Sequence, residues 1–277
     1  MIPTRAALAS ASATAAAAAA MLLRHEQTTR LATERFAAAA LETVLNAIDA
    51  NDSETGAHVR RVATYSLILS DAADLPEREC NSIERVALFH DIGKIHEALF
   101  DITHDDHKLT AAERRAIDTH PARGAKVLAP LSGFYPELSD GVLSHHERWD
   151  GKGYPRGLKG TRIPLSARVV AIADTFDAIT YRRRYREGRS IQVAQQVLVE
   201  GRGTQFEPDL LDLFLFPPVF ARVAAAARKV ERWRKPVEQR RTGRDEENVP
   251  DINFRWRPGR HAGRGRPASD RARRTAR

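Results

Sequence analysis

The sequence has little of several residue types on which common protein classes depend. It contains one cysteine, Cys80, in 277 residues, so it can form neither an intramolecular disulfide nor a multi-cysteine zinc cluster. It has no strongly apolar run of the roughly 18 residues that a transmembrane helix needs. The alanine-rich segment 6–23 lacks the leucine-rich core and the basic start of a secretory signal peptide. These absences together predict a cytoplasmic protein.

The positive charge is confined to one end of the chain. The formal net charge is +8, but residues 228–277 hold 17 Lys/Arg against 7 Asp/Glu, which leaves 27 against 29 in residues 1–227. The tail is rich in arginine and glycine with isolated aromatic residues, a composition that predicts disorder. Contact with nucleic acid or an anionic membrane is one interpretation of the tail. A solvated extension is the other, and it is favoured because composition alone specifies no partner.

The rest of the chain is predicted to be all-α. Alternating apolar and polar residues with hairpin turns, the signature of strands, are nearly absent. Residues 1–40 form an alanine-rich segment with high helix propensity, and 41–220 form the globular body. Helical apolar spacing begins at Leu41 and recurs over 59–69, after Pro76, and over 110–129, 137–147, 166–180 and 190–200. Four glycines and two prolines within 149–164 predict a structured loop there.

Histidines and carboxylates carry the chemistry of the body. His90 and Asp91 follow an apolar helix, Glu54 and His58 are spaced to share a helix face, and Asp174 lies in an apolar helix. A buried carboxylate is costly unless it is paired or binds a metal. His120 and the pair His145-His146 complete the set. Each histidine alone is more often an ordinary residue, but their joint occurrence in one helical body predicts a site for Mn, Fe, Co or Ni.

Two motifs resemble a known family. The segment His90-Asp91-Ile92-Gly93-Lys94 resembles the HD motif of the HD phosphohydrolase superfamily. The segment that runs from His145 through Gly153-Tyr154-Pro155 resembles the GYP signature of the HD-GYP subfamily. The resemblance extends over 41–216, about two thirds of the chain, and implies an HD-type helical bundle with a GYP extension.

The resemblance implies a site and a reaction. The reaction is hydrolysis of the bacterial second messenger cyclic di-GMP to pGpG, GMP or both, with two or three divalent ions, iron or manganese, as cofactors. Asp91 would bridge two ions and Lys94 would stabilise charge at the phosphate, as catalytic residues. Substrate contacts would come from Tyr154, Arg183 and Arg186. The implied metal ligands are Glu54 (which would help to hold a third ion), His58, His90, Asp91, His120, His145, His146 and Asp174.

The chain departs from the family pattern in two places. Where the family usually reads Asp-Arg-Pro-Tyr, this chain has Arg182-Arg183-Arg184-Tyr185, which adds charge and removes a proline. The loop over 96–108 is acidic and lacks the usual prolines. The first departure keeps open a second hypothesis, a phosphohydrolase for another cyclic dinucleotide or nucleotide.

A third hypothesis is a signalling adaptor that binds cyclic di-GMP or a diguanylate cyclase without turnover. The complete ligand set argues against it, because binding alone would not require every metal residue. The 40 residues before the body are too few for a sensor domain, so regulation is expected from partner proteins, metal supply or an N-terminal helix that forms a homodimer stalk. His25, His96, His104, His107 and His261 have no role in the resemblance and are expected to face solvent.

Overall fold

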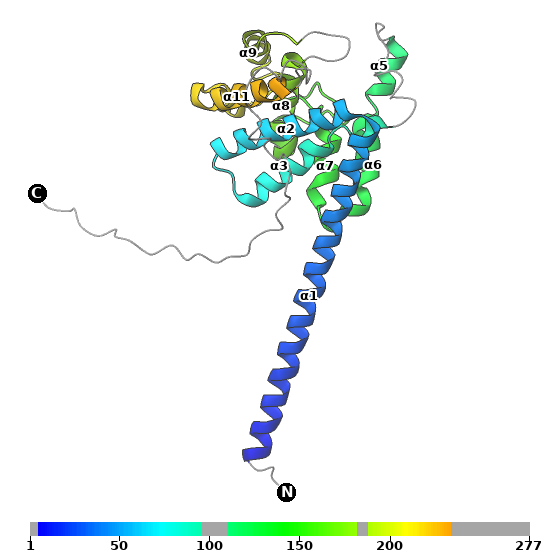
Figure 1. Ribbon diagram of the computed structural model, residues 1–277, viewed down its shortest axis with the longest axis vertical. Coiled ribbons are helices and arrows are strands. Elements are labelled where there is room, and N and C mark those ends of the chain that lie inside the picture. Colours follow the sequence, from blue (N-terminus) through cyan, green and yellow to red (C-terminus); the bar gives the residue numbers. More distant parts are fainter. Residues whose placement is uncertain (1–4, 96–109, 182–187, 234–277) are drawn as a thin grey trace, which may run out of the picture. The chain divides into compact units, whose positions relative to one another are not determined.

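The computed structural model describes residues 5–95, 110–181 and 188–233, and the side chains of these except at 5–18, 51 and 229–233 (Figure 1). The described residues form helices and no strand, apart from an isolated bridge between Arg202 and Phe206, so the predicted all-α class is confirmed. The α-helices are α1 (Arg5–Asn51), α2 (Ser53–Ala72), α3 (Glu77–Phe89), α5 (Ala111–Ile117), α6 (His120–Leu128), α7 (Pro136–Ser144), α8 (Leu165–Thr180), α9 (Ile191–Glu200), α10 (Pro208–Leu215) and α11 (Pro217–Trp233). Short 3-10 helices are η1 (Ile92–Ile95), η2 (Ala129–Leu131) and η3 (Gly160–Arg162).

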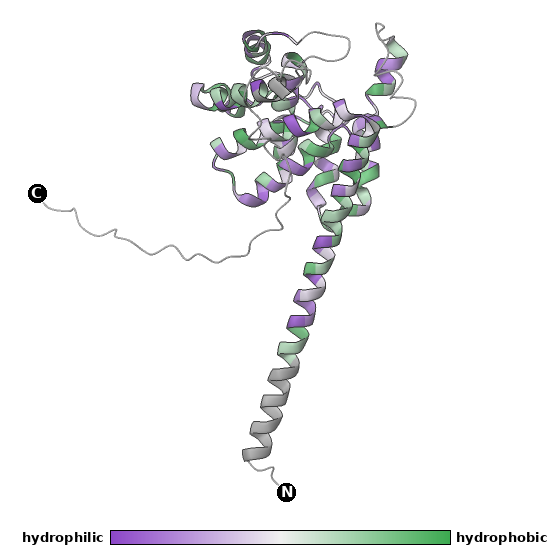
Figure 2. Ribbon diagram, in the orientation of Figure 1, coloured by the Kyte–Doolittle hydropathy of each residue, from purple (hydrophilic) through white to green (hydrophobic). Residues whose placement is uncertain are grey.

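The chain divides into two compact units. Of the described residues, 5–38 belong to one unit and those from Ala39 onward belong to the other. In the first unit, the coloured part of α1 carries both hydrophobic and hydrophilic residues, and Met21, Leu22 and Leu23 are exposed (Figure 2). In the second unit, Leu41 and Ile48 of α1 are buried in the core. The predicted boundary between residues 40 and 41 stays a prediction. The predicted tail, 228–277, lies almost entirely outside the described residues.

Helices α2, α3 and α8 pack against one another and form the centre of the body. Their facing sides carry aliphatic and aromatic side chains, and removal of each from water contributes about 1.5–3 kcal/mol. Fully buried members of this core are Val62, Leu69, Ile83, Val86, Val169, Ile172 and Phe176. Because α2 and α8 carry His58 and Asp174 and α3 leads directly into His90, the core holds this part of the candidate site on a rigid frame.

The helix ends follow local sequence signals. Asp52 caps α2 by accepting hydrogen bonds from the backbone N–H groups of Glu54 and Thr55. The helical spacing predicted over 110–129 corresponds to two helices, α5 and α6, with a break between them that the spacing does not show. Pro121 stands in the first turn of α6. Proline has no N–H to donate, so it is tolerated in the first turn of a helix but would interrupt a helix that continued from α5. The break places His120 at a helix start.

No single described helix is long and apolar enough to cross a bilayer. Only α10 and α11 taken together, bent by 70° over Pro208–Leu215 and Pro217–Arg228, reach the required length and composition. Leu211, Phe214 and Val223 of this pair are fully buried in the body, which accounts for its apolar composition.

Candidate metal centre

The candidate histidines lie at the ends of helices. His90 directly follows α3, His145 directly follows α7, and His120 opens α6 just after α5. Each ring donates its Nδ1–H to a backbone carbonyl three residues earlier: His90 to Ala87 at 2.8 Å, His120 to Ile117 at 2.6 Å and His145 to Val142 at 2.6 Å. The last carbonyls of a helix have no partner within the helix, so they are free to accept. Three imidazoles are thereby held with Nε2 directed away from their own helices.

A glycine brings two of these helix ends together. A Cβ atom on Gly93, in η1, would lie 2.0 Å from the carbonyl oxygen of His120 and 2.7 Å from the backbone nitrogen of Gly124. Only glycine permits this approach of η1 to α6. The glycine of the HD motif therefore sets the distance between Asp91 and His120.

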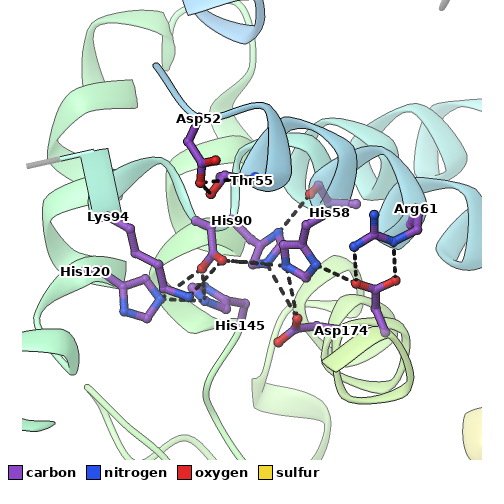
Figure 3. A network of polar contacts seen from close by, with 12 residues as sticks. Asp52, Thr55, His58, Arg61, His90, Lys94, His120, His145 and Asp174 are labelled. Atoms are coloured by element: carbon purple, nitrogen blue, oxygen red, sulfur yellow. Dashed lines mark hydrogen bonds and ion pairs between the residues drawn. The ribbon is translucent and has the colours of Figure 1, made fainter. Parts of the chain in front are cut away.

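Asp91 lies at the centre of the cluster, and its two carboxylate oxygens face different histidines. Oδ2 lies 3.5 Å from Nε2 of His90 and 3.6 Å from Nε2 of His58. Oδ1 lies 3.4 Å from Nε2 of His120 and 4.0 Å from Nε2 of His145. Figure 3 shows His120 and His145 on one side of the network and His58 and Asp174 on the other. Asp91 thus spans two sets of donors.

Within the described residues, two groups have donor atoms close enough to share one metal ion. The first contains His58, His90 and Asp174, and the second contains His120, His145 and His146. Three buried atoms in the cluster have no hydrogen-bond partner, namely Nε2 of His58, Nε2 of His90 and Oδ1 of Asp91. Buried polar atoms are rarely left unpaired, and metal ions in the two groups would supply their partners. Imidazoles and carboxylates are ligand types that divalent metal ions accept.

The protonation states in the second group favour metal binding. Burial, with help from the neighbouring His120, lowers the pKa of His146 to about 3, and burial also lowers the pKa of His145. Both rings are therefore neutral and can offer a lone pair. In the first group burial alone would lower the pKa of His58, but the carboxylates of Asp174 and Asp177 outweigh burial and raise it to about 9.

His58 is oriented by a side chain, in contrast to the other rings. It lies inside α2 and its Nδ1 is 2.7 Å from Oδ2 of Asp177 in α8. Arg61 binds both oxygens of the same carboxylate, through Nε at 2.7 Å and Nη2 at 2.8 Å. Burial opposes ionisation of Asp177, but Arg61 and His58 hold its pKa below the usual value.

The glycine-rich loop after α7 places Tyr154 against the centre. The Tyr154 ring stacks on the His146 ring with centroids 4.9 Å apart and planes at 25°. A Cβ atom on Gly153 would lie 2.3 Å from the Arg148 nitrogen and 2.6 Å from the His146 carbonyl oxygen, so only glycine allows the loop to fold back on itself. Glu147 is buried and fixes the far side of the loop by accepting hydrogen bonds from the backbone N–H groups of Arg156 at 2.7 Å and Leu158 at 2.9 Å.

The other predicted site residues have different positions. Lys94 is partly buried, with Nζ 2.8 Å from Oδ2 of Asp91. Glu54 lies in the first turn of α2 and belongs to neither group, so its assignment to a third ion stays a prediction. Arg183 and Arg186 lie outside the described residues, as do His96, His104, His107 and His261. His25 is exposed, as expected.

Sequence reasoning missed Asp177, Arg61 and Glu147. Asp177 follows Asp174 by three residues in the same apolar helix and so shares its face, which is a signal that could have found it. Arg61 follows His58 by the same spacing on α2. Glu147 stands inside the GYP motif, yet nothing in the sequence shows that its carboxylate holds the loop and not a metal ion.

The comparisons with known proteins agree with this geometry. The model of the HD domain family matches residues 42–210, more than half of the chain. The chain therefore belongs to the HD domain family, and its second motif makes it an HD-GYP member of that family.

Curated relatives match the same region of the chain. A 3′3′-cGAMP-specific phosphodiesterase 2 of Vibrio cholerae is 38% identical over 172 residues, which are 61% of this chain and 33% of the relative. The cyclic di-GMP phosphodiesterase response regulator RpfG of Xanthomonas campestris is 36% identical over 177 residues, 63% of this chain and 46% of the relative. A cyclic di-GMP phosphodiesterase of Thermotoga maritima is 34% identical over 184 residues, 66% of this chain and 50% of the relative. The chain thus spans a third to a half of the length of these relatives.

Proposed function

We propose that the protein is a metal-dependent phosphodiesterase that hydrolyses cyclic di-GMP to pGpG, GMP or both. The observation that carries the proposal is the position of Asp91, whose two oxygens face two separate groups of metal-binding side chains. A phosphodiester is anionic and repels hydroxide, so its hydrolysis near neutral pH requires an activated water and neutralised charge. A carboxylate shared between two ion sites is suited to that need.

The residues that would hold the ions are the two groups and Asp91 between them. A pair of divalent ions there would lower the pKa of a water and neutralise the phosphoryl oxygens during in-line attack. Iron or manganese is the proposed occupant, because the donors are imidazoles and carboxylates. Glu54 is proposed as a contact to a third ion, from the turn that precedes His58.

Other residues of the chain would bind and orient the substrate. Lys94, beside Asp91, places a positive charge at the edge of the centre, where a phosphate oxygen would lie. Tyr154 offers an aromatic face to a guanine base, and its contact with His146 ties that face to the centre. Arg183 and Arg186 are proposed to bind the second phosphate, since guanidinium groups pair with phosphate in a bidentate manner.

A second candidate substrate is 3′3′-cGAMP. The relative that is 38% identical carries that specificity in its name, and the charged segment 182–184 departs from the usual cyclic di-GMP pattern. Cyclic di-GMP and 3′3′-cGAMP differ in one base, so they place the same demands on the ions and on Lys94. Discrimination would fall to the residues that contact the bases.

The test is a product assay on purified full-length protein loaded anaerobically with Fe(II) or Mn(II). Cyclic di-GMP, 3′3′-cGAMP and cyclic di-AMP are incubated separately and the products are separated by chromatography. We expect pGpG or GMP from cyclic di-GMP, and no product from an Asp91→Ala control. Faster cleavage of 3′3′-cGAMP would move the assignment to the second candidate. No cleavage of any substrate by metal-loaded protein would refute the proposed activity and favour a binding role.

The proposed activity assigns the protein to cytoplasmic second-messenger signalling. A diguanylate cyclase, which would supply the substrate, is the proposed class of protein partner. A second copy of the chain, paired through the helical segment before residue 39, is the proposed route to a dimer.

A further inference from the structure

His58 differs from the other buried histidines in what fixes its ring. His90, His120 and His145 each use an unpaired carbonyl at the end of a preceding helix. His58 lies inside α2, where the nearby carbonyls already accept the hydrogen bonds of the helix. No equivalent backbone acceptor exists at this position, so its orientation requires a side chain from another element.

Asp177 supplies that side chain from α8. Its Oδ2 is 2.7 Å from Nδ1 of His58, and only 1% of the residue is exposed. An ionised carboxylate can only accept, so a proton stays on Nδ1, and the proton on Nε2 is the one that a metal ion would displace. Nε2 is directed at Oδ1 of Asp174, 3.3 Å away, in the first candidate group.

Arg61 in turn fixes Asp177. The Arg61 guanidinium donates to both carboxylate oxygens of Asp177, and Arg61 is 4% exposed. The Cζ atom of Arg61 lies over the Tyr181 ring, 3.2 Å from the ring centre, which leaves Arg61 little freedom to turn. Arg61 stands three residues after His58 on α2, so one helix carries both the ring and the group that holds the orienting carboxylate. A buried ion pair arranged in this way fixes geometry even where it adds little stability.

We propose that Asp177, clamped by Arg61, is a positioning residue that holds the His58 ring for metal binding in the His58–His90–Asp174 group. The inference rests on the proposed metal centre. Asp177 is not a ligand here, because its two oxygens are taken by Arg61 and His58. An asparagine at 177 would offer one carbonyl oxygen to Arg61 and His58, which are both donors. Its amide N–H groups would face one of these two donors, so that contact would be lost. The ring would lose its fixed orientation without loss of side-chain volume.

The test measures metal affinity directly, with Mn(II) as the probe. Metal-free full-length protein is titrated with Mn(II), and the free ion is counted by its electron paramagnetic resonance signal. The wild type is expected to bind two ions. Asp177→Asn is expected to weaken one of these by about 10- to 100-fold and to leave the other unchanged. Wild-type affinity at both positions in a folded Asp177→Asn protein would overturn the inference.

A matched control removes a similar ion pair elsewhere. Glu207 and Arg168 form a mostly buried pair, and neither residue belongs to a ligand group. Glu207→Gln is expected to bind Mn(II) like the wild type, and an equal loss in both variants would overturn the positioning role. Far-ultraviolet circular dichroism checks that the variants fold.

A second variant covers the case in which Asp177→Asn does not fold. Arg61→Lys keeps the charge but offers the carboxylate a single donor group, so it is expected to weaken the same ion by less than Asp177→Asn would. Unchanged affinity in Arg61→Lys would then overturn the inference. A wild type that binds no Mn(II) would instead refute the proposed metal centre itself, which separates the two failures.

Discussion

The two candidate ligand groups lie on either side of Asp91 but are built differently. The first, His58, His90 and Asp174, includes a carboxylate and one ring that a carboxylate orients. The second, His120, His145 and His146, consists of imidazoles alone, and backbone carbonyls orient two of them. The first group draws on α2, α3 and α8 in the core, and the second draws on α6 and the segment after α7.

This difference implies that the two ion positions are not equivalent. Carboxylate oxygen favours harder ions such as manganese, whereas a set of three imidazoles suits iron, nickel or zinc. Asp174 also gives the first group a negative charge that the second group lacks, and the second depends on Asp91 for its anionic donor. Asp91 faces both groups, but the groups differ in charge and in the contacts that orient their ligands.

The largest effect is expected from Asp91→Ala, because the two oxygens of its carboxylate face different groups. Loss of this carboxylate removes the anionic donor of the second group and one donor of the first. We expect both ions to be lost and turnover to fall by about a thousandfold, which corresponds to about 4 kcal/mol. Inductively coupled plasma mass spectrometry of the dialysed protein measures the metal content, and the product assay measures turnover. Retained metal with substantial turnover would contradict the shared role.

The contrast between the groups is tested by removing one member of each. Asp174→Asn is expected to release the ion of the first group, and His146→Ala the ion of the second. Each should weaken one ion by at least about a hundredfold, since loss of a ligand should exceed the effect of losing an outer contact. Metal content after dialysis should fall from two ions to one in each variant. Loss of both ions in either variant would show that the groups act as one site.

A smaller effect is expected at Tyr154, which touches the second group without belonging to it. Tyr154→Ala removes the stacking face beside His146 and should raise KM about 5- to 30-fold, in line with about 1–2 kcal/mol for one stacked base. Metal content should stay at the wild-type value. Tyr154→Phe keeps the ring and should behave like the wild type in the same steady-state assay. Metal loss in Tyr154→Ala would show that the ring supports His146 more than it binds substrate.

Most of the fold could be predicted from the sequence because its signals are local. Apolar spacing located α8 and α9 to within a residue, and the four glycines of 149–164 indicated the loop. The break between α5 and α6 was missed because the apolar spacing continues through it, although Pro121 marks it. Helix α1 continues past residue 40 without a break, as the high helix propensity of the alanine-rich segment allows.

The ligand groups could be predicted as a set but not as two halves. The motifs name the residues, yet the division between halves depends on which Asp91 oxygen each ring faces. The partner of His58 is 119 residues away in the sequence and that of Arg61 is 116 residues away, so no local pattern joins them. Glu54 shows the converse, because its spacing from His58 predicts a ligand that the two groups do not include.

The smallest effect is expected at Glu147, which stands next to His146 but acts on the loop. Its two oxygens accept one backbone N–H group each, from Arg156 and Leu158. Glu147→Gln keeps the volume but leaves one buried N–H group without its acceptor, at a cost of about 1–3 kcal/mol in the free energy of unfolding. Urea denaturation measures that cost. Metal content should not change, and KM should rise by no more than Tyr154→Ala raises it, because the tyrosine is displaced and not removed. Loss of the ion of the His120, His145 and His146 group in Glu147→Gln would instead mean that Glu147 also holds His146 in place. The GYP loop would then be part of the support of that group.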